Sequence, residues 1–146
     1  MKILIIDDDA VFVNGMKKLL ELRIIPAVMA TNVTEVKKIL KEEEISLICA
    51  DWDLGDGTGL EVLQYATEKN IPVVFFTGHD EGFYKEKAMS LGAARYYIKG
   101  QTNYKNLINE LITLSVWQHP KSPQKEVSNI VEAPKNAASA ILGASF

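Results

Sequence analysis

Acidic side chains, a hydroxyl group and an ammonium group directly follow four short apolar runs of this sequence. Asp7 and Asp8 come after the first run, Asp51 after the third, Thr77 after the fourth and Lys99 after the fifth. If these runs are parallel strands, their carboxyl ends meet at one edge of a sheet, where open α/β sheets bind ligands. Crowded carboxylates raise one another's pKa unless a cation relieves them, and hard oxygen ligands suit Mg²⁺ or Mn²⁺. The spacing therefore predicts a site for a divalent metal ion.

The elements that must position these residues follow a regular alternation. Short β-branched apolar runs alternate with stretches of helical period, which indicates repeated βα units around a parallel sheet. The expected strands are Ile3–Ile6, about Ala27–Ala30, Leu47–Ala50, Val73–Phe76 and Tyr96–Ile98. The first, third and fourth are continuously apolar, as strands buried on both faces should be. The sequence thus predicts an α/β domain with five strands.

Five helices are expected between and after these strands. The apolar faces of the first three would consist of Val11, Met16, Leu19 and Leu20, of Val33, Val36, Ile39 and Leu40, and of Leu60, Val62, Leu63 and Ala66. The fourth would span about Phe83–Leu91, and the fifth would bury Leu107, Ile108, Leu111, Ile112 and Leu114. Asp9 is a candidate cap of the first helix, and Asn32 with Glu35 fits a capping box at the second.

Composition excludes several classes of protein. The chain has 146 residues, of which 47% are hydrophobic and 24% are charged, and its net charge is −3. This is ordinary for one globular domain, and it lacks the basic patch of a chain that binds nucleic acid by itself. No apolar run approaches the roughly 18 residues that cross a bilayer, and no leader precedes Lys2, so we expect a cytoplasmic protein without membrane contact. The single cysteine, Cys49, lies in an apolar run and should pack as a small hydrophobic side chain.

The character of the sequence changes after Trp117. Pro120, Pro123 and Pro134 interrupt a segment of Lys, Ser, Asn and Ala that has few apolar residues. This segment is too short to form a domain of its own. We therefore expect one domain over residues 1–117, followed by a linker or flexible C-terminal tail over residues 118–146.

Four segments resemble the response-regulator receiver family of two-component signalling, over about residues 1–117. They are Ile3–Asp9 (ILIIDDD), Ala50–Leu63 (ADWDLGDGTGLEVL), Val73–His79 (VVFFTGH) and Tyr96–Lys99 (YYIK). The resemblance implies a chemotaxis-Y-like fold, a doubly wound parallel sheet in the flavodoxin-like order 2-1-3-4-5 with five helices. It also implies a phosphorelay domain that accepts a phosphoryl group from a sensor histidine kinase or a phosphotransfer protein. Such a domain is a signalling phosphoacceptor rather than an enzyme, although it catalyses its own phosphorylation and dephosphorylation.

The resemblance assigns a role to each acidic residue at the strand ends. Asp51 resembles the phosphoacceptor, whose carboxylate would attack the phosphoryl group of a phosphohistidine and form an acyl phosphate. Asp7 and Asp8 resemble the pair that holds the metal ion. Asp51 and the backbone carbonyl of Asp53 would complete the ligands that the protein offers to Mg²⁺ or Mn²⁺.

The remaining family positions would bind the phosphate and report its presence. Lys99 and Thr77 would each contact an oxygen of the attached phosphoryl group. A shift of Thr77 toward the phosphate would make room for Tyr96, which resembles the aromatic switch residue of the family. The two movements would remodel the face of the fourth helix, fifth strand and fifth helix, where partners or a second copy of the chain would bind.

Three residues beside the expected phosphate are candidates for modulating its lifetime or access to it. Asp53 and His79 lie where they could contact the attacking water or the incoming phosphodonor. Gly78 would leave the site open to a bulky donor.

The chain departs from the family at three loop positions. Gly100 replaces the proline that usually follows the lysine through a cis peptide bond. Because a non-proline cis bond costs roughly 2.5–4 kcal/mol, we expect a trans peptide or a more mobile loop at Lys99. Gly55 and Thr58 replace a loop proline and a loop acid, and these changes should alter the stiffness of the loop more than its chemistry.

Two other functions fit parts of the sequence. Asp51 and Asp53 after an apolar strand resemble the nucleophile motif of haloacid-dehalogenase-type phosphatases, but the late acidic pair of that family does not follow Lys99 here. A pseudo-receiver binding module would keep the fold without the reaction, which Gly100 leaves open.

The closing residues Ile141–Phe146 resemble the start of the ATPase domain of enhancer-binding transcription activators. The chain could thus be the receiver of a longer transcription regulator or a receiver that stands alone.

Overall fold

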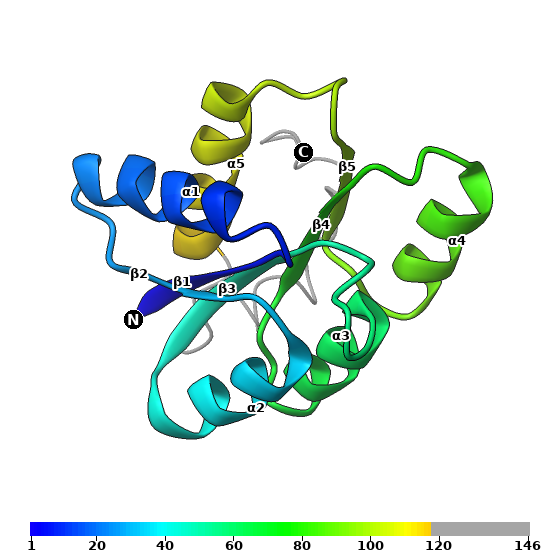
Figure 1. Cartoon of the computed structure of the whole chain (residues 1–146), viewed down its shortest axis with the longest axis horizontal. Helices are drawn as coiled ribbons and strands as arrows, with labels where there is room; N and C mark the ends of the chain where they lie inside the picture. The colour runs from blue at the N-terminus through cyan, green and yellow to red at the C-terminus, as the bar shows by residue number, and fades with distance from the viewer. Residues whose placement is uncertain (118–146) are drawn as a thin grey trace, which may run out of the picture.

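The structure, a computed structural model, describes residues 1–117, in which a parallel β-sheet lies between two layers of helices (Figure 1). The strands are β1 (Lys2–Ile6), β2 (Ala27–Ala30), β3 (Ile45–Ala50), β4 (Val73–Thr77) and β5 (Arg95–Ile98). The helices are α1 (Ala10–Leu22), α2 (Val33–Glu42), α3 (Gly59–Glu68), α4 (Gly82–Ser90) and α5 (Tyr104–Trp117). The sheet order is β2-β1-β3-β4-β5, which confirms the predicted α/β fold. The linker or tail expected over residues 118–146 lies outside the described residues.

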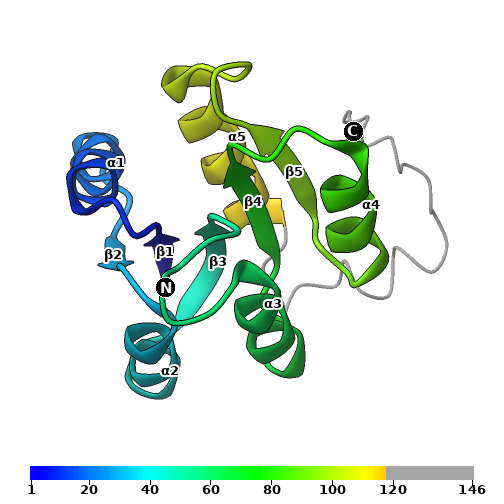
Figure 2. The same cartoon turned by 45° about the vertical axis from the view of Figure 1, so that its right-hand side comes forward.

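The sheet separates two hydrophobic clusters. The helices that cover them lie on opposite faces of the sheet, α1 and α5 on one and α2, α3 and α4 on the other (Figure 2). Leu4 and Ile6 of β1 belong to the cluster beneath α2, α3 and α4, whereas Ile3 and Ile5 belong to the cluster beneath α1 and α5. Successive side chains of a strand point to opposite faces, so a strand covered on both faces is apolar at every position. None of the helices within residues 1–117 is long and apolar enough to span a membrane.

The pairing of the strands brings the residues that follow them to one edge of the sheet. Ile6 of β1 pairs with Ala50 of β3, so Asp7 and Asp51 leave adjacent strands at the same level. The backbone amide of Asp51 donates a hydrogen bond of 3.0 Å to the carbonyl of Ile6. Thr77 ends the neighbouring strand β4 and is fully buried. The register alone therefore gathers the predicted site.

The apolar face predicted for α1 is partly wrong. Met16 and Leu20 are buried as expected, but Val11 and Leu19 are exposed by 82% and 39%. The buried stripe runs through Val13, Met16 and Leu20, which are spaced by three and four residues. Because one residue turns an α-helix by about 100°, Val11 lies on the opposite side from a stripe that begins at Val13.

The predicted cap of α1 is confirmed, and that of α2 is half correct. Asp9 Oδ1 accepts hydrogen bonds from two amides of the first turn of α1, at 3.0 and 3.2 Å. Asn32 Oδ1 accepts from the amide of Glu35 at 2.8 Å. The carboxylate of Glu35, however, accepts from the amide of Thr31 at 2.7 Å rather than from that of Asn32. The second hydrogen bond of a capping box is therefore donated by Thr31, one residue before the cap.

Candidate functional site

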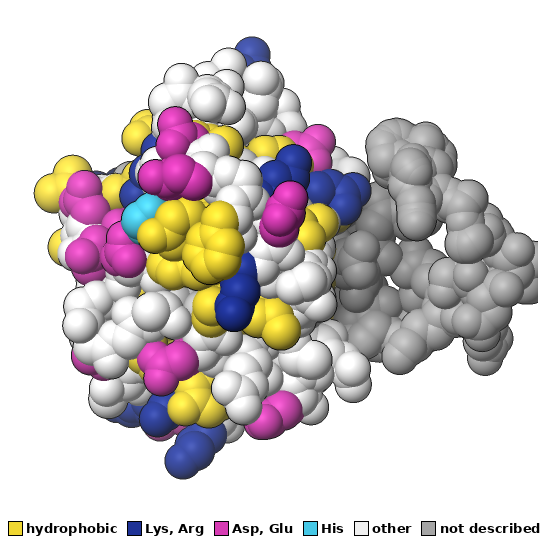
Figure 3. Space-filling view, turned by 90° about the vertical axis from the view of Figure 1, so that its right-hand side faces the viewer, with side chains coloured by type: hydrophobic (Ala, Val, Ile, Leu, Met, Phe, Trp, Pro, Cys, Tyr) yellow, Lys and Arg dark blue, Asp and Glu magenta, His cyan; other side chains and the backbone are white. Residues whose placement is uncertain are grey.

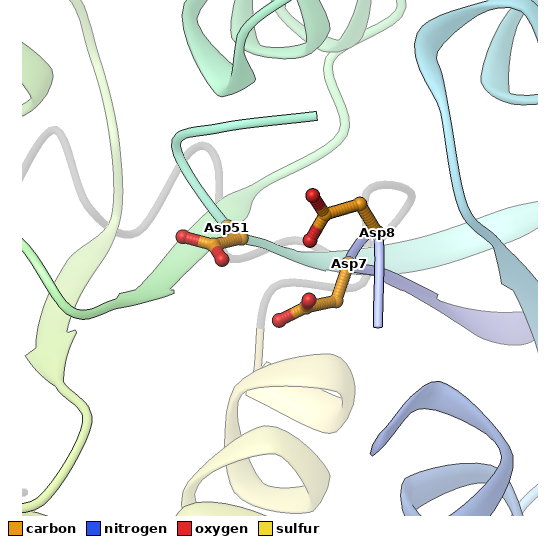
Figure 4. A group of neighbouring side chains, drawn as sticks. All are labelled: Asp7, Asp8 and Asp51. Atoms are coloured by element: carbon orange, nitrogen blue, oxygen red, sulfur yellow. The ribbon is translucent and has the colours of Figure 1, made fainter. Parts of the chain in front are cut away.

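Three carboxylates meet at the carboxyl edge of the sheet (Figure 4). Asp7, Asp8 and Asp51 each offer one oxygen atom, and these atoms lie within 4.8 Å of one another. Asp7 and Asp51 are buried, whereas Asp8 is exposed. Burial raises the pKa of Asp7, and the negative charge of Asp51 adds to this effect. Oxygen ligands grouped in this way fit a hard divalent cation such as Mg²⁺.

Lys99 lies between two of these carboxylates. Its Nζ atom is 2.7 Å from Asp7 Oδ2 and 3.0 Å from Asp51 Oδ2. Burial opposes the charged ammonium, but the hydrogen bonds to Asp7 and Asp51 outweigh burial and raise the pKa of Lys99. The peptide bond to Gly100 is trans, as predicted, and Gly100 adopts the left-handed φ of 91° that favours glycine. Lys99 thus reaches the acidic residues without the proline that is usual in the family.

Thr77 and Tyr96 both contact the backbone of the loop that follows β4. The Thr77 hydroxyl accepts a hydrogen bond of 3.4 Å from the amide of His79. The hydroxyl of Tyr96 donates a hydrogen bond of 2.7 Å to the carbonyl of His79. Burial raises the pKa of Tyr96 to about 12, so this hydroxyl stays protonated and remains a donor at neutral pH. The two residues predicted to form the switch therefore share one neighbour.

Two of the three residues predicted to modulate the phosphate, His79 and Asp53, contact each other. Nε2 of His79 is 2.7 Å from Asp53 Oδ2, across the loops that follow β3 and β4. The imidazole ring stacks on Tyr84, with ring centroids 4.1 Å apart, and Tyr84 meets the ring of Trp52 edge-on at 4.8 Å. Figure 3, which views the side of the molecule on the right of Figure 1, shows a histidine beside a hydrophobic patch, with acidic side chains nearby. Sequence reasoning named His79 and Asp53 separately and missed their contact.

Two glycines shape the site in opposite ways. A Cβ atom on Gly78 would meet nothing within 4 Å, and the access for a phosphodonor expected at that position stays a prediction. A Cβ atom on Gly59 would lie 2.7 Å from the Phe75 ring and even closer to the carbonyl oxygen of Asp51. Gly59 therefore allows α3 to begin directly against the backbone of Asp51, a role that sequence reasoning missed.

Comparison with known proteins defines the class. Residues 3–111 match the family described as the response regulator receiver domain. The chain therefore belongs to the receiver domains of two-component response regulators, which are signalling domains rather than classical enzymes and which interact with histidine kinases or phosphotransfer proteins. The match favours neither the haloacid-dehalogenase-type phosphatase nor the pseudo-receiver.

Several known proteins are similar to this chain in sequence or fold. It is 32% identical over 98 residues to the aerobic respiration control protein ArcA of Escherichia coli strain K12, over 66% of this chain and 41% of ArcA. The chain thus spans about two fifths of that relative. The CheY-like receiver domain protein of Methanospirillum hungatei JF-1 shares the fold with a TM-score of 0.75 at 24% identity, over 83% of this chain and 98% of that one. A response regulator of Burkholderia pseudomallei, solved with a phosphorylated aspartic acid, a calcium ion and citrate, has a TM-score of 0.66 at 25% identity, over 92% and 74%.

Proposed function

We propose that this receiver accepts a phosphoryl group on Asp51 from a phosphohistidine of a sensor histidine kinase or phosphotransfer protein. The observation that carries the proposal is the position of the Asp51 carboxylate, 3.0 Å from the Lys99 ammonium and grouped with Asp7 and Asp8. A carboxylate oxygen of Asp51 would attack phosphorus, the P–N bond would break, and its electron pair would leave with the imidazole of the donor. The related Burkholderia pseudomallei protein, solved with a phosphorylated aspartic acid, supports this assignment.

A divalent ion, Mg²⁺ or Mn²⁺, would neutralise the negative charge that the phosphoryl group brings to the acidic site. Asp7, Asp8, Asp51 and the backbone carbonyl of Asp53 would hold it. Lys99 would keep its contact with Asp7 and turn its remaining hydrogen atoms toward an oxygen of the phosphoryl group. The calcium ion of the related structure is consistent with a cation at such a site.

Thr77 and Tyr96 would carry the signal to the surface. The Thr77 hydroxyl would leave the amide of His79, at 3.4 Å, for an oxygen of the phosphoryl group. The loop after β4 would follow, and with it the carbonyl to which Tyr96 donates. These movements would change the face of α4, β5 and α5, where Phe83 of α4 is exposed by 66% and could contact a partner or a second copy of the chain.

Asp53, Gly78 and His79 would set the lifetime of the phosphoryl group and its access to donors. The 2.7 Å contact between His79 and Asp53 would hold both side chains beside the phosphoryl group. Each side chain fixes the position of the other, so replacing either one would change how a water molecule could be oriented toward phosphorus. Self-dephosphorylation should therefore depend on this pair.

The proposal extends to the surroundings of the domain. The net charge of −3 and the absence of a basic run favour a chain without direct contact to nucleic acid. A phosphodonor of this class implies a cytoplasmic location. Residues 118–146 would link the receiver to an output region, as in a longer transcription regulator, or would end a receiver that stands alone.

Phosphorylation with a small donor tests the acceptor. The protein is incubated with acetyl phosphate and Mg²⁺, and its mass is measured. We expect the wild-type protein to gain the mass of one phosphoryl group. We expect no gain when EDTA is present from the start of the reaction, and none in Asp51→Asn. Asp9→Asn is the matched control, because Asp9 is a neighbouring acid that caps α1, and asparagine also caps helices. An unmodified wild-type protein, or an Asp51→Asn variant that still gains the mass, would refute the proposal.

A further inference from the structure

The loop between β3 and α3 begins with Asp51 and folds back on itself a few residues later. Asp53 and Thr58 form an isolated antiparallel bridge, and the amide of Leu54 donates to the carbonyl of Gly57 at 3.1 Å. This hairpin-like turn includes the backbone of Asp53, which the proposed function assigns to the metal ion. Whatever holds the tip of the turn therefore also holds that backbone.

The tip of the turn needs glycine and excludes proline. Gly55 has a φ of 76°, a left-handed conformation that favours glycine. The proline that is usual at this position in the family fixes φ near −65°, so it could not form this turn. The loop of this chain therefore lacks the stiffness that a proline would supply.

Asp56, the second residue at the tip, binds the N-terminus of α2. Its Oδ1 atom accepts a hydrogen bond of 2.7 Å from the amide of Val33, and its Oδ2 atom accepts from the amide and the hydroxyl of Thr34, at 3.1 and 2.9 Å. The first amides of a helix have no partner within the helix, and the positive end of the helix dipole favours a carboxylate there. The hydrogen bond from Val33, followed by those from Thr34, lowers the pKa of Asp56, so the carboxylate is charged at neutral pH.

The rest of the turn lies closely against α2 and α3. A Cβ atom on Gly57 would lie 2.8 Å from Val33 Cγ2 and would overlap the carboxylate of Glu61. That carboxylate accepts a hydrogen bond of 3.1 Å from the amide of Thr58. The turn is therefore fixed to α3 by Glu61 and to α2 by Asp56, on either side of Gly57.

We infer that Asp56 is a positioning residue of the phosphorylation site, whose carboxylate fastens the β3–α3 loop to the N-terminus of α2 and so fixes the backbone of Asp53. The inference rests on the proposed function, because it concerns the loop that would hold the metal ion. In this chain, which has Gly55 in the loop, the side chain of Asp56 thus restrains the loop. Asp56 is not one of the carboxylates grouped at the proposed metal site, so it would act only through the loop.

The test compares two caps of the same helix. Asp56→Ala removes the bonds between the loop and α2, whereas Asn32→Ala removes the bond to the amide of Glu35 and leaves the loop untouched. Mg²⁺ alone is titrated into ¹⁵N-labelled full-length protein, and its affinity is taken from the amide shifts of residues 51–59. We expect Asp56→Ala to weaken Mg²⁺ binding about tenfold and Asn32→Ala to change it by less than about twofold, since loss of an outer support typically costs 10–100-fold in metal affinity. Both variants should lower the melting temperature.

Amide hydrogen exchange without metal provides a second readout. Exchange of the amides of residues 53–58 should be faster in Asp56→Ala and unchanged in Asn32→Ala. Wild-type Mg²⁺ affinity in Asp56→Ala, or equal weakening in both variants, would overturn the positioning role. If the wild-type protein does not bind Mg²⁺, the proposed function fails, and unchanged exchange in Asp56→Ala would then also overturn the fastening of the loop.

Discussion

Replacement of Lys99 by methionine should destabilise the protein by an amount that the structure allows us to estimate. At 2.7 and 3.0 Å, each of its two ion pairs has a gross attraction of about 6 kcal/mol at an effective dielectric constant of about 20, most of which the desolvation of the charges offsets. Removing one partner of a fully buried pair costs about 3–5 kcal/mol. Because the Lys99 side chain is 33% exposed, water screens its charge, and we expect a loss of about 2 kcal/mol in the free energy of unfolding.

The loss should depend on pH. Contacts with Lys99 oppose the effect of burial on Asp7, so in Lys99→Met the pKa of Asp7 should rise further above its usual value. A group whose pKa is raised on folding stabilises the folded state at low pH, and this contribution is lost as the pH rises through its folded pKa. The raised pKa of Lys99 lies above 10.5, so the wild-type ion pairs persist throughout the neutral range. The difference in free energy of unfolding between the two proteins should therefore be largest at neutral pH. It should shrink toward acidic pH, because protonation of Asp7 then stabilises the folded variant more than the folded wild type.

Thermal unfolding followed by circular dichroism measures both effects. A loss of about 2 kcal/mol corresponds to a fall in melting temperature of about 5–10 °C for a domain of this size. Mg²⁺ should raise the melting temperature of Lys99→Met more than that of the wild type, because it would supply the missing positive charge. Lys17→Met is the matched control, since Lys17 forms a 2.7 Å surface pair with Glu21 that should contribute about 0.5 kcal/mol or less. Equal melting temperatures of Lys99→Met and wild type from acidic to neutral pH would refute the reasoning.

Three further changes have defined outcomes. Gly59→Ala would force a Cβ atom against the carbonyl of Asp51, so it should lower the free energy of unfolding in urea by about 3 kcal/mol and slow phosphorylation by acetyl phosphate. Gly15→Ala, which has open space around it, should instead stabilise α1 by about 0.5–1 kcal/mol. Equal changes in the free energy of unfolding of the two variants would contradict this. Burial raises the pKa of the Cys49 thiol to about 12, so native protein at pH 8 should resist a thiol reagent that labels it rapidly in urea; fast labelling of native protein would contradict the buried position. Tyr96→Phe removes a hydroxyl that donates to the loop after β4, so it should lower the free energy of unfolding by about 1 kcal/mol. It should also change how phosphorylation alters the hydrogen exchange of the amides in that loop. The same change in amide exchange as in the wild type would exclude Tyr96 from the switch.

The strands of this protein could be predicted because their signal is local. A strand covered by helices on both faces is mostly apolar, so residues 3–6 of β1, 47–50 of β3 and 73–76 of β4 are visible as unbroken apolar runs. The first residue after such a run lies at the carboxyl edge of the sheet, whatever the details of packing. Asp7 and Asp51 could therefore be assigned to one site before any distance between them was known.

Helix faces and caps were harder to predict, because competing positions differ by one or two residues. Val11 and Leu19 are as apolar as the residues that α1 buries, and only the contact of the helix with the sheet decides which stripe faces inward. Glu35 had two amides within reach and binds that of Thr31. In both cases the alternatives are equivalent in the sequence and differ only in the folded chain.

The sequence by itself determined which chemical groups stand at the carboxyl edge of the sheet, since their places depend only on where each strand ends. The tertiary structure decided which contacts form at this edge and in the loops beside it: Lys99 with both Asp7 and Asp51, His79 with Asp53, and Asp56 with the first amides of α2. Each of these contacts joins residues more than twenty positions apart, and no local pattern encodes it. Such contacts form only when the packing of helices on the sheet sets the distance between loops, which is why they required the folded structure.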